Sequence, residues 1–183
     1  NKMSISRTPV RQALKKLEEQ ELVEISPYKG AVVREISYDE TVDLLETRKV
    51  IESFLCKKVA QKITEKEISE LNKILTSYEK AYENHNYEMM LMKNFQFHTY
   101  IAQISDNQVI EKFYENLRAR LNILTSQSLP FANRDFLTLK EHREIVKALE
   151  SKDTEKAIQC SKKHNENIKR ILFKRLERKE SIF

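Results

Sequence analysis

The sequence predicts a mainly α-helical protein, with a small helix-and-ribbon unit over residues 1–36 and an antiparallel six-helix bundle over residues 37–183. Its 183 residues include one glycine and three prolines, which leaves little material for turns. Charged residues make up 33% and hydrophobic residues 40%, as in helices with one apolar and one solvated face. Two capping-box signals, Ser37-Tyr38-Asp39-Glu40 and Thr64-Glu65-Lys66-Glu67, precede long stretches of helical periodicity.

The first element is a short helix that starts near Ser6. Ser6 or Thr8 can cap it, and Pro9 is tolerated in the first turn because its missing N–H has no partner there. Apolar residues recur at helical spacing and form one stripe: Val10, Ala13, Leu14 and Leu17. Residues 1–17 contain no acid but five basic residues, Lys2, Arg7, Arg11, Lys15 and Lys16. A short basic helix suits the major groove and the phosphates of DNA.

Two β-rich runs follow, Leu22–Ser26 and Ala31–Arg34, joined by Pro27-Tyr28-Lys29-Gly30. Gly30 is the sole glycine of the chain, and it permits the positive φ of a tight hairpin. A helix followed by a two-stranded ribbon with a basic tip is the outline of a winged helix-turn-helix. The alternative is a small α/β packing unit without a role in DNA binding.

The stretch Ser6-Arg7-Thr8-Pro9-Val10-Arg11-Gln12-Ala13-Leu14, together with Leu22-Val23 and Lys29-Gly30-Ala31, resembles the DNA-binding signature of GntR-family bacterial transcription regulators. Family members carry about a helix and a half before this point, so the head is expected to be a winged helix-turn-helix that is N-terminally incomplete. The resemblance implies operator DNA as a partner. It places six residues at the DNA: Arg7, Thr8, Arg11, Lys15, Lys29 and Gly30.

Helical periodicity after the ribbon predicts six helices, beyond a short linker near 35–37. They are expected over about 37–62, 64–84, 87–104, 108–127, 134–150 and 153–178. Polar turns at 84–86 and 105–107 and a loop at 130–133 separate some of them. No apolar run approaches the length of a membrane span.

Arg48 lies in the middle of an apolar stripe formed by Leu44, Leu45, Ile51, Leu55 and Val59. A charge in such a place is unfavourable unless it is paired. One interpretation is a structural ion pair with Glu52, one helical turn away. The other is a guanidinium that receives an anionic ligand, because its two parallel donors match a carboxylate.

Three of the four histidines repeat this pattern on three different predicted helices: His98, His142 and His164. A single histidine on an apolar stripe is more often a hydrogen-bonded core residue. Three that converge, with Asn94 one turn before His98, favour a divalent metal site for zinc, nickel or a similar ion.

These residues also carry a second resemblance. Asn94, Phe97-His98, Asn107, Glu141-His142, His164 and Glu46-Thr47-Arg48 with Glu52 look like the C-terminal effector domain (FCD type) of the FadR subfamily of GntR regulators, over about 38–178. In that family one Asp and three His usually hold a divalent metal, which helps to bind a small carboxylate effector. Carried over, the metal ligands are Asn94, His98, His142 and His164, and the effector-binding residues are Arg48, Glu52 and Arg120.

Asn94 departs from the usual Asp of the family. An amide oxygen is neutral and a weaker donor than a carboxylate. The ion is therefore expected to be held less tightly, while it keeps its full positive charge for an anionic effector.

The expected function is that of a cytoplasmic transcription regulator, not an enzyme, which binds operator DNA as a homodimer and responds to a carboxylate. One rival is a regulator that binds its ligand without metal. The other is a metal-dependent hydrolase. Such an enzyme needs a general base, and no Asp or Glu shares the predicted helix faces of His98 or His142, which speaks against this alternative. Cys56 and Cys160 lack metal-type or redox-type spacing, and with no signal peptide they are expected to be buried cytosolic thiols, away from any membrane.

Overall fold

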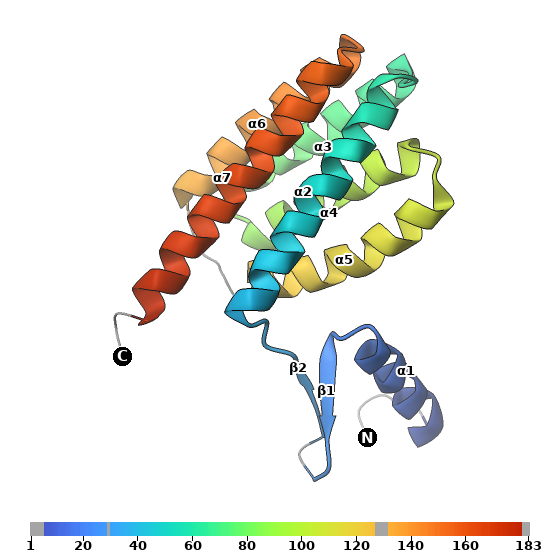
Figure 1. Ribbon diagram of the computed structural model, residues 1–183, viewed down its shortest axis with the longest axis vertical. Helices are drawn as coiled ribbons and strands as arrows, with labels where there is room; N and C mark the ends of the chain where they lie inside the picture. Colours follow the sequence, from blue (N-terminus) through green and yellow to red (C-terminus); the bar gives the residue numbers. More distant parts are fainter. Residues whose placement is uncertain (1–5, 29, 127–131, 181–183) are drawn as a thin grey trace.

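The computed structural model describes residues 6–28, 30–126 and 132–180, and it is mainly α-helical (Figure 1). A head consists of helix α1 (Arg7–Glu19) and strands β1 (Val23–Ser26) and β2 (Gly30–Val33). Six helices follow: α2 (Tyr38–Ala60), α3 (Glu65–Glu83), α4 (Tyr87–Ile104), α5 (Gln108–Ser126), α6 (Ala132–Glu150) and α7 (Thr154–Glu180). The predicted fold class is confirmed, and most helix ends fall within about two residues of their predicted places.

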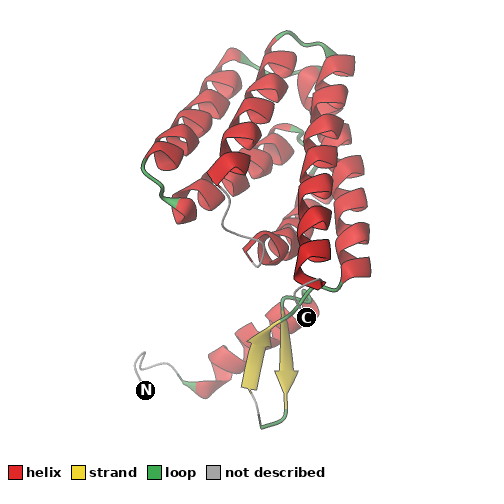
Figure 2. Cartoon of the chain, turned by 90° about the vertical axis from the view of Figure 1, so that its left-hand side faces the viewer, coloured by secondary structure: helices red, strands yellow, loops and turns green. Residues whose placement is uncertain are grey.

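The two strands of the head pair antiparallel, with Val23 opposite Val33 and Ser26 opposite Gly30. Gly30 has a φ of +80°, the left-handed conformation expected at this hairpin. The ribbon projects from the end of the bundle, beside α1 (Figure 2). Lys29, predicted at the tip, lies outside the described residues.

Helix α1 buries none of its residues against the rest of the described chain. Val10 is 46% exposed and Leu17 37% exposed, and only Leu14 of the predicted apolar stripe is half-buried. The apolar residues thus form a stripe at helical spacing, but the other described residues of the head bury little of it.

The bundle is built around α2 and α7, which lie side by side over most of their length (Figure 1). Helix α3 packs against α4 and α6, and α4 also contacts α5. Fully buried side chains from several helices form one core, among them Leu55, Leu71, Phe97, Leu121 and Leu149. Across the described ranges, no helix is long and apolar enough to span a membrane.

The two predicted capping boxes have different outcomes. At the start of α3, the Thr64 hydroxyl accepts from the backbone N–H of Glu67, and the Glu67 carboxylate accepts from the N–H of Thr64. At the start of α2, Ser37 accepts from the N–H of Glu40, but the return bond is missing. The capping box at Ser37 is therefore only half formed, because the Glu40 carboxylate binds two arginines instead.

Three helix-to-helix turns of the bundle use non-glycine residues in the left-handed conformation. His85, Asp106 and Lys152 each have a φ of 54°. This follows from the composition, since the only glycine of the chain is in the head ribbon. Of the predicted loop at 130–133, residues 130–131 lie outside the described residues, and residues 132–133 belong to α6, which begins at Ala132, two residues before its predicted start.

Candidate metal and effector site

Three histidines from three helices meet inside the bundle. His98 comes from α4, His142 from α6 and His164 from α7, and all are at most 3% exposed. One ring nitrogen from each forms a group in which every pair lies within 4.8 Å. The Nε2 atoms of His98 and His142 are 3.2 Å apart. The structure thus brings together the three histidines that the sequence singled out.

Two buried carboxylates fix the tautomers of two of these histidines. Nδ1 of His98 lies 3.1 Å from Oε1 of Glu52, and Nδ1 of His164 lies 2.7 Å from Oε2 of Glu141. Because a carboxylate only accepts, each Nδ1 carries the hydrogen and each Nε2 keeps a lone pair. Metal-binding histidines have this second partner almost without exception. The residues present therefore fit a divalent metal.

His142 differs from the other two. Its ring stacks on Phe97 at a centroid distance of 4.2 Å, and its Nδ1 is buried with no hydrogen-bond partner in the described structure. Its Nε2 faces the same centre as the other two rings. Packing rather than a hydrogen bond to a carboxylate thus orients this imidazole.

Arg48, from α2, reaches the same centre and is 4% exposed. Its Nε donates to Oε1 of Glu52 over 2.9 Å, the ion pair that the sequence suggested. Its Nη2 lies 3.2 Å from Nε2 of His98 and 3.4 Å from Nε2 of His164. Arg48 therefore belongs to both an ion pair and the histidine cluster.

Glu52 collects donors from several helices. Besides Arg48 and His98, it accepts from the Tyr114 hydroxyl of α5 and, over 2.8 Å, from Nδ2 of Asn165 of α7. Burial alone would raise the pKa of Glu52, but Arg48 and the nearby imidazoles hold that pKa well below its usual range. Burial and the Glu52 charge raise the pKa of Tyr114 well above its usual value. Glu52 is thus an ionised carboxylate beside a neutral phenol.

The cluster histidines are neutral. Burial lowers the pKa of His98 to about 3, although Glu52 acts in the opposite direction. Burial and the neighbouring imidazoles lower the pKa of His142, and burial lowers that of His164 against the effect of Glu141. Neutral imidazoles are the form in which histidine ligates a metal.

Arg118 is a buried arginine that the sequence analysis missed. It is 2% exposed on α5, and its guanidinium carbon lies 5.3 Å from the centroid of the Phe95 ring. Its Nε and Nη2 have no hydrogen-bond partner among the described residues. Burial and the charge of Arg48 lower its pKa. A signal was present, because Tyr114, Leu117 and Leu121 flank it at helical spacing, as apolar residues flank Arg48.

The structure places Asn94 one turn before His98 on α4, half-buried. Its side chain makes no hydrogen bond within the described part of the chain, so a role at an ion stays a prediction.

Arg120, predicted at the effector, is not brought to the histidines. It lies where the head meets the bundle: its Nη1 is 2.8 Å from Oε2 of Glu21 in the head, and its Nη2 donates to Glu40 of α2. Arg34, just after β2, pairs with the same two acids, at 2.9 Å from Glu40 and 3.5 Å from Glu21. We call Glu21, Arg34, Glu40 and Arg120 the junction cluster.

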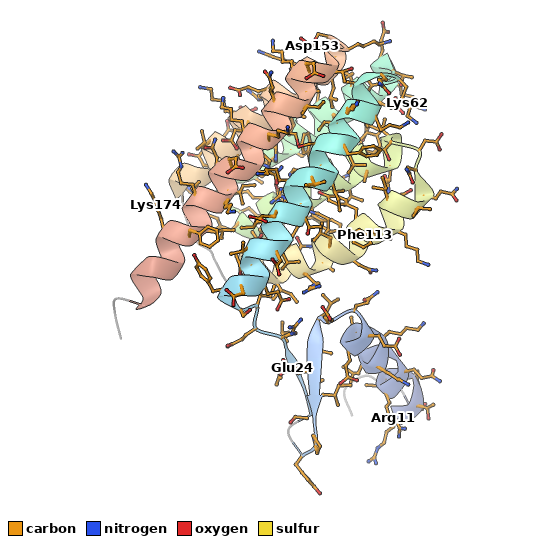
Figure 3. The ribbon with its side chains drawn as sticks, viewed as in Figure 1. Arg11, Glu24, Lys62, Phe113, Asp153 and Lys174 are labelled. Carbon is orange, nitrogen blue, oxygen red and sulfur yellow. The ribbon has the colours of Figure 1, made fainter. Side chains whose placement is uncertain are left out.

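A cleft of about 530 Å³ lies beside the junction cluster, between the end of α1 and helices α2 and α5. Its lining includes Glu19, Asp43, Phe113 and Asn116, and Nε2 of Gln20 lies 3.4 Å from Oδ1 of Asn116 across it. Figure 3 labels Phe113 on the α5 side of this junction. Polar and ionic contacts therefore connect the head to α2 and α5.

Four of the six residues predicted to bind DNA lie on the surface of α1. Arg7, Thr8, Arg11 and Lys15 are exposed and line one shallow hollow along the helix, with Gln12 between them. Arg11 lies on the part of the head away from the bundle (Figure 3). Gly30 forms the start of β2.

Comparison with known proteins gives a family match over most of the bundle. Residues 43–167 match the family model described as FCD domain. The chain is 28% identical over 167 residues to the HTH-type transcriptional repressor RspR of Escherichia coli (strain K12). The aligned region covers 91% of this chain and 73% of that protein.

Two solved structures have a similar fold. E. coli McbR/YncC superposes with a TM-score of 0.87 at 20% identity, covering 96% of this chain and 84% of that one. The metal-free FCD domain of TM0439 superposes with a TM-score of 0.60 at 23% identity, and the match covers 74% of this chain and 93% of that one. Because the family model matches over the helices that carry the histidine cluster, the chain belongs to the FCD domain family.

Proposed function

We propose that this protein is a DNA-binding transcription regulator whose helical bundle binds a small carboxylate effector at a divalent metal. Residues 1–36 form the DNA-binding head, and residues 37–183 form the effector-binding and dimerisation domain. The named regulator among its relatives supports the first part. The histidine cluster supports the second.

The observation that carries the metal proposal is the pairing of His98 and His164 with Glu52 and Glu141. This pairing leaves neutral imidazoles with Nε2 lone pairs at one centre, which is what a zinc or nickel ion requires. His98, His142 and His164 would hold the ion, with Asn94 as a further ligand. A bound ion would supply positive charge and an open coordination position for a carboxylate.

Two buried arginines support an anionic effector. Arg48 is at the histidines, and Arg118 has buried donors that no described residue accepts. Donors of this kind bind carboxylates with two parallel hydrogen bonds. The junction cluster supports a link from this site to the head, because α2 carries both Glu40 and Arg48, and α5 carries both Arg118 and Arg120.

The test is a calorimetric titration of zinc chloride and nickel chloride into chelator-treated protein, followed by acetate, lactate, succinate and citrate. We expect one ion per chain and a carboxylate that binds more tightly to the metal-loaded protein. A protein that takes up neither ion, with His98→Ala indistinguishable from the parent chain, would contradict the metal site. A carboxylate that binds equally well without metal would favour the metal-independent regulator.

The DNA-binding part is tested separately, by selecting binding sites from a pool of genomic fragments and measuring fluorescence anisotropy on the selected sequence. We expect the anisotropy midpoint to shift when the bound carboxylate is added. A chain that contains the whole head and selects no sequence would contradict the regulator function.

A further inference from the structure

The guanidinium of Arg48 uses the same lone pairs that would ligate a metal. Nη2 lies 3.2 Å from Nε2 of His98 and 3.4 Å from Nε2 of His164. A guanidinium nitrogen only donates hydrogen bonds, and both Nε2 atoms accept because their Nδ1–H groups are directed at Glu52 and Glu141. The two hydrogens of Nη2 therefore occupy two of the three ligand positions.

The third position is also engaged in this state. Nε2 of His142 lies 3.2 Å from Nε2 of His98, so one of these nitrogens must carry a hydrogen for the contact to be favourable. Nε2 of His98 does not carry it, because its hydrogen is on Nδ1. His142 therefore carries its hydrogen on Nε2, where it shares the single lone pair of His98 Nε2 with Nη2 of Arg48, and its own Nδ1 is left as an acceptor. This agrees with the missing partner of Nδ1 among the described residues.

We infer that the Arg48 side chain and a divalent metal ion are alternative occupants of the three-histidine centre. An ion can enter only when Nη2 of Arg48 withdraws and His142 moves its hydrogen from Nε2 to Nδ1. The inference rests on the metal site of the proposed function. The bond from Arg48 Nε to Glu52 is separate from the two Nη2 contacts, so the exchange need not break the ion pair.

The exchange has a consequence for ligand binding. While Arg48 is in the centre, its Nη2 donors are satisfied by imidazoles and are not offered to an anion. Entry of the ion releases these donors next to a new positive charge. The ion and the carboxylate should therefore bind in that order.

The experiment is a calorimetric titration of zinc chloride into the full chelator-treated chain, for the parent protein, Arg48→Leu and the control Arg118→Leu. Both variants lose a buried positive charge near the histidines, but only Arg48 contacts their Nε2 atoms among the described contacts. We expect Arg48→Leu to bind zinc about ten- to a hundredfold more tightly, because the ion no longer has to displace a charged hydrogen bond from the histidines, and such a bond contributes about this factor. Arg118→Leu should change the affinity far less.

Each outcome decides between the proposals. Equal or weaker zinc binding by Arg48→Leu, or the same gain in both variants, overturns the exchange. A parent chain without zinc affinity beside an Arg48→Leu chain with it supports the exchange, and contradicts a resident metal in the unaltered protein. Absence of zinc binding from all three chains, with no nickel uptake either, overturns the metal site of the proposed function and the exchange that rests on it.

A second measurement avoids dependence on a variant that fails to fold. Arg48→Leu combined with Glu52→Gln removes both charges of the pair, and it should bind zinc more tightly than Glu52→Gln alone, because both chains lack the carboxylate partner of His98 and differ only at Arg48. In the parent chain, nitrogen NMR should show the Arg48 side-chain signals and the His142 ring nitrogens shifting together as zinc is added. Zinc uptake with the Arg48 signals unmoved would overturn the inference.

Discussion

Nδ1 of His164 and Oε2 of Glu141 form a 2.7 Å hydrogen bond in which both side chains are almost fully buried. This bond fixes the tautomer that leaves Nε2 of His164 free to ligate. We expect Glu141→Gln to weaken zinc binding by about ten- to a hundredfold, the usual effect of removing such a partner. Glu144→Gln is the control, since Glu144 lies three residues later on α6 and pairs with Lys163 at the surface. Similar zinc affinities in both variants would show that the bond has no role at the ion.

Asn94→Asp tests the ligand that departs from the family pattern. A carboxylate is a stronger donor than an amide, so we expect zinc affinity to rise by about one decade, roughly 1.4 kcal/mol. The added negative charge should also weaken binding of a carboxylate to the metal-loaded protein. Asn84→Asp, at the exposed end of α3, adds the same charge away from the cluster and should change neither affinity. Unchanged zinc binding in Asn94→Asp would remove Asn94 from the ligand set.

The buried histidines predict a loss of stability in acid for the chelator-treated protein. The pKa of His98 is lowered from 6.5 to about 3, so this group stabilises the fold fully above pH 6.5 and progressively less as pH falls toward 3. His142 and His164 shift in the same direction. The pKa of Glu52 is also lowered, so its own contribution decreases further below pH 4.5.

Protonation of His98 alone should remove about 1.4 kcal/mol of unfolding free energy per pH unit below 6.5. Urea unfolding at a series of pH values from 7.5 to about 4.5 measures the slope. His98→Gln should flatten that slope by about one proton. A pH-independent parent protein would mean that the histidines are not buried in the neutral form.

Arg120→Gln tests the junction cluster. Arg120 is about a quarter exposed, so we expect a loss of at most about 1 kcal/mol in global stability. Backbone amides of residues 20–40 should nevertheless exchange faster, because Arg120 ties Glu21 to Glu40. Arg143→Gln breaks the surface pair with Glu79 elsewhere on the bundle and serves as the control. Equal exchange in 20–40 for both variants would argue against a mechanical link.

Arg11→Ala tests the DNA-binding face of α1. If Arg11 reads a base, the loss should be about 1–3 kcal/mol of operator affinity at fixed salt. Lys16→Ala, on the same helix but outside the predicted contact set, controls for the change in net charge. Equal losses would indicate general electrostatic attraction rather than base reading.

The sequence predicts most of the fold because its signals are local. Asn86, Asn107 and Asp153 accept from the backbone N–H three residues later at the starts of α4, α5 and α7, and such caps can be recognised without tertiary information. The convergence of the three histidines was also predictable, since each lies on the apolar side of its own helix.

Other parts of the site depend on contacts between distant segments. Helical spacing accounts for the Arg48 Nε bond to Glu52, but Nη2 reaches His164, 116 residues away in the sequence. The same limit applies to Arg120, whose partner Glu40 is 80 residues away. The half-formed capping box at Ser37 has the same cause, because the Glu40 carboxylate binds Arg34 and Arg120 instead of the N-cap backbone. The local sequence pattern does not reveal these two contacts.

The contacts of Glu52 favour cooperative folding of the bundle in a single step. Its one buried carboxylate is satisfied by donors from α2, α4, α5 and α7, namely Arg48, His98, Tyr114 and Asn165. An intermediate with α4, α5 or α7 undocked would leave the Glu52 carboxylate of α2 with too few partners, which is strongly unfavourable while that charge is buried. Partly assembled states are therefore raised in free energy relative to both the folded and the unfolded chain. The slowest-exchanging amides of these four helices should then open together, as one cooperative unit.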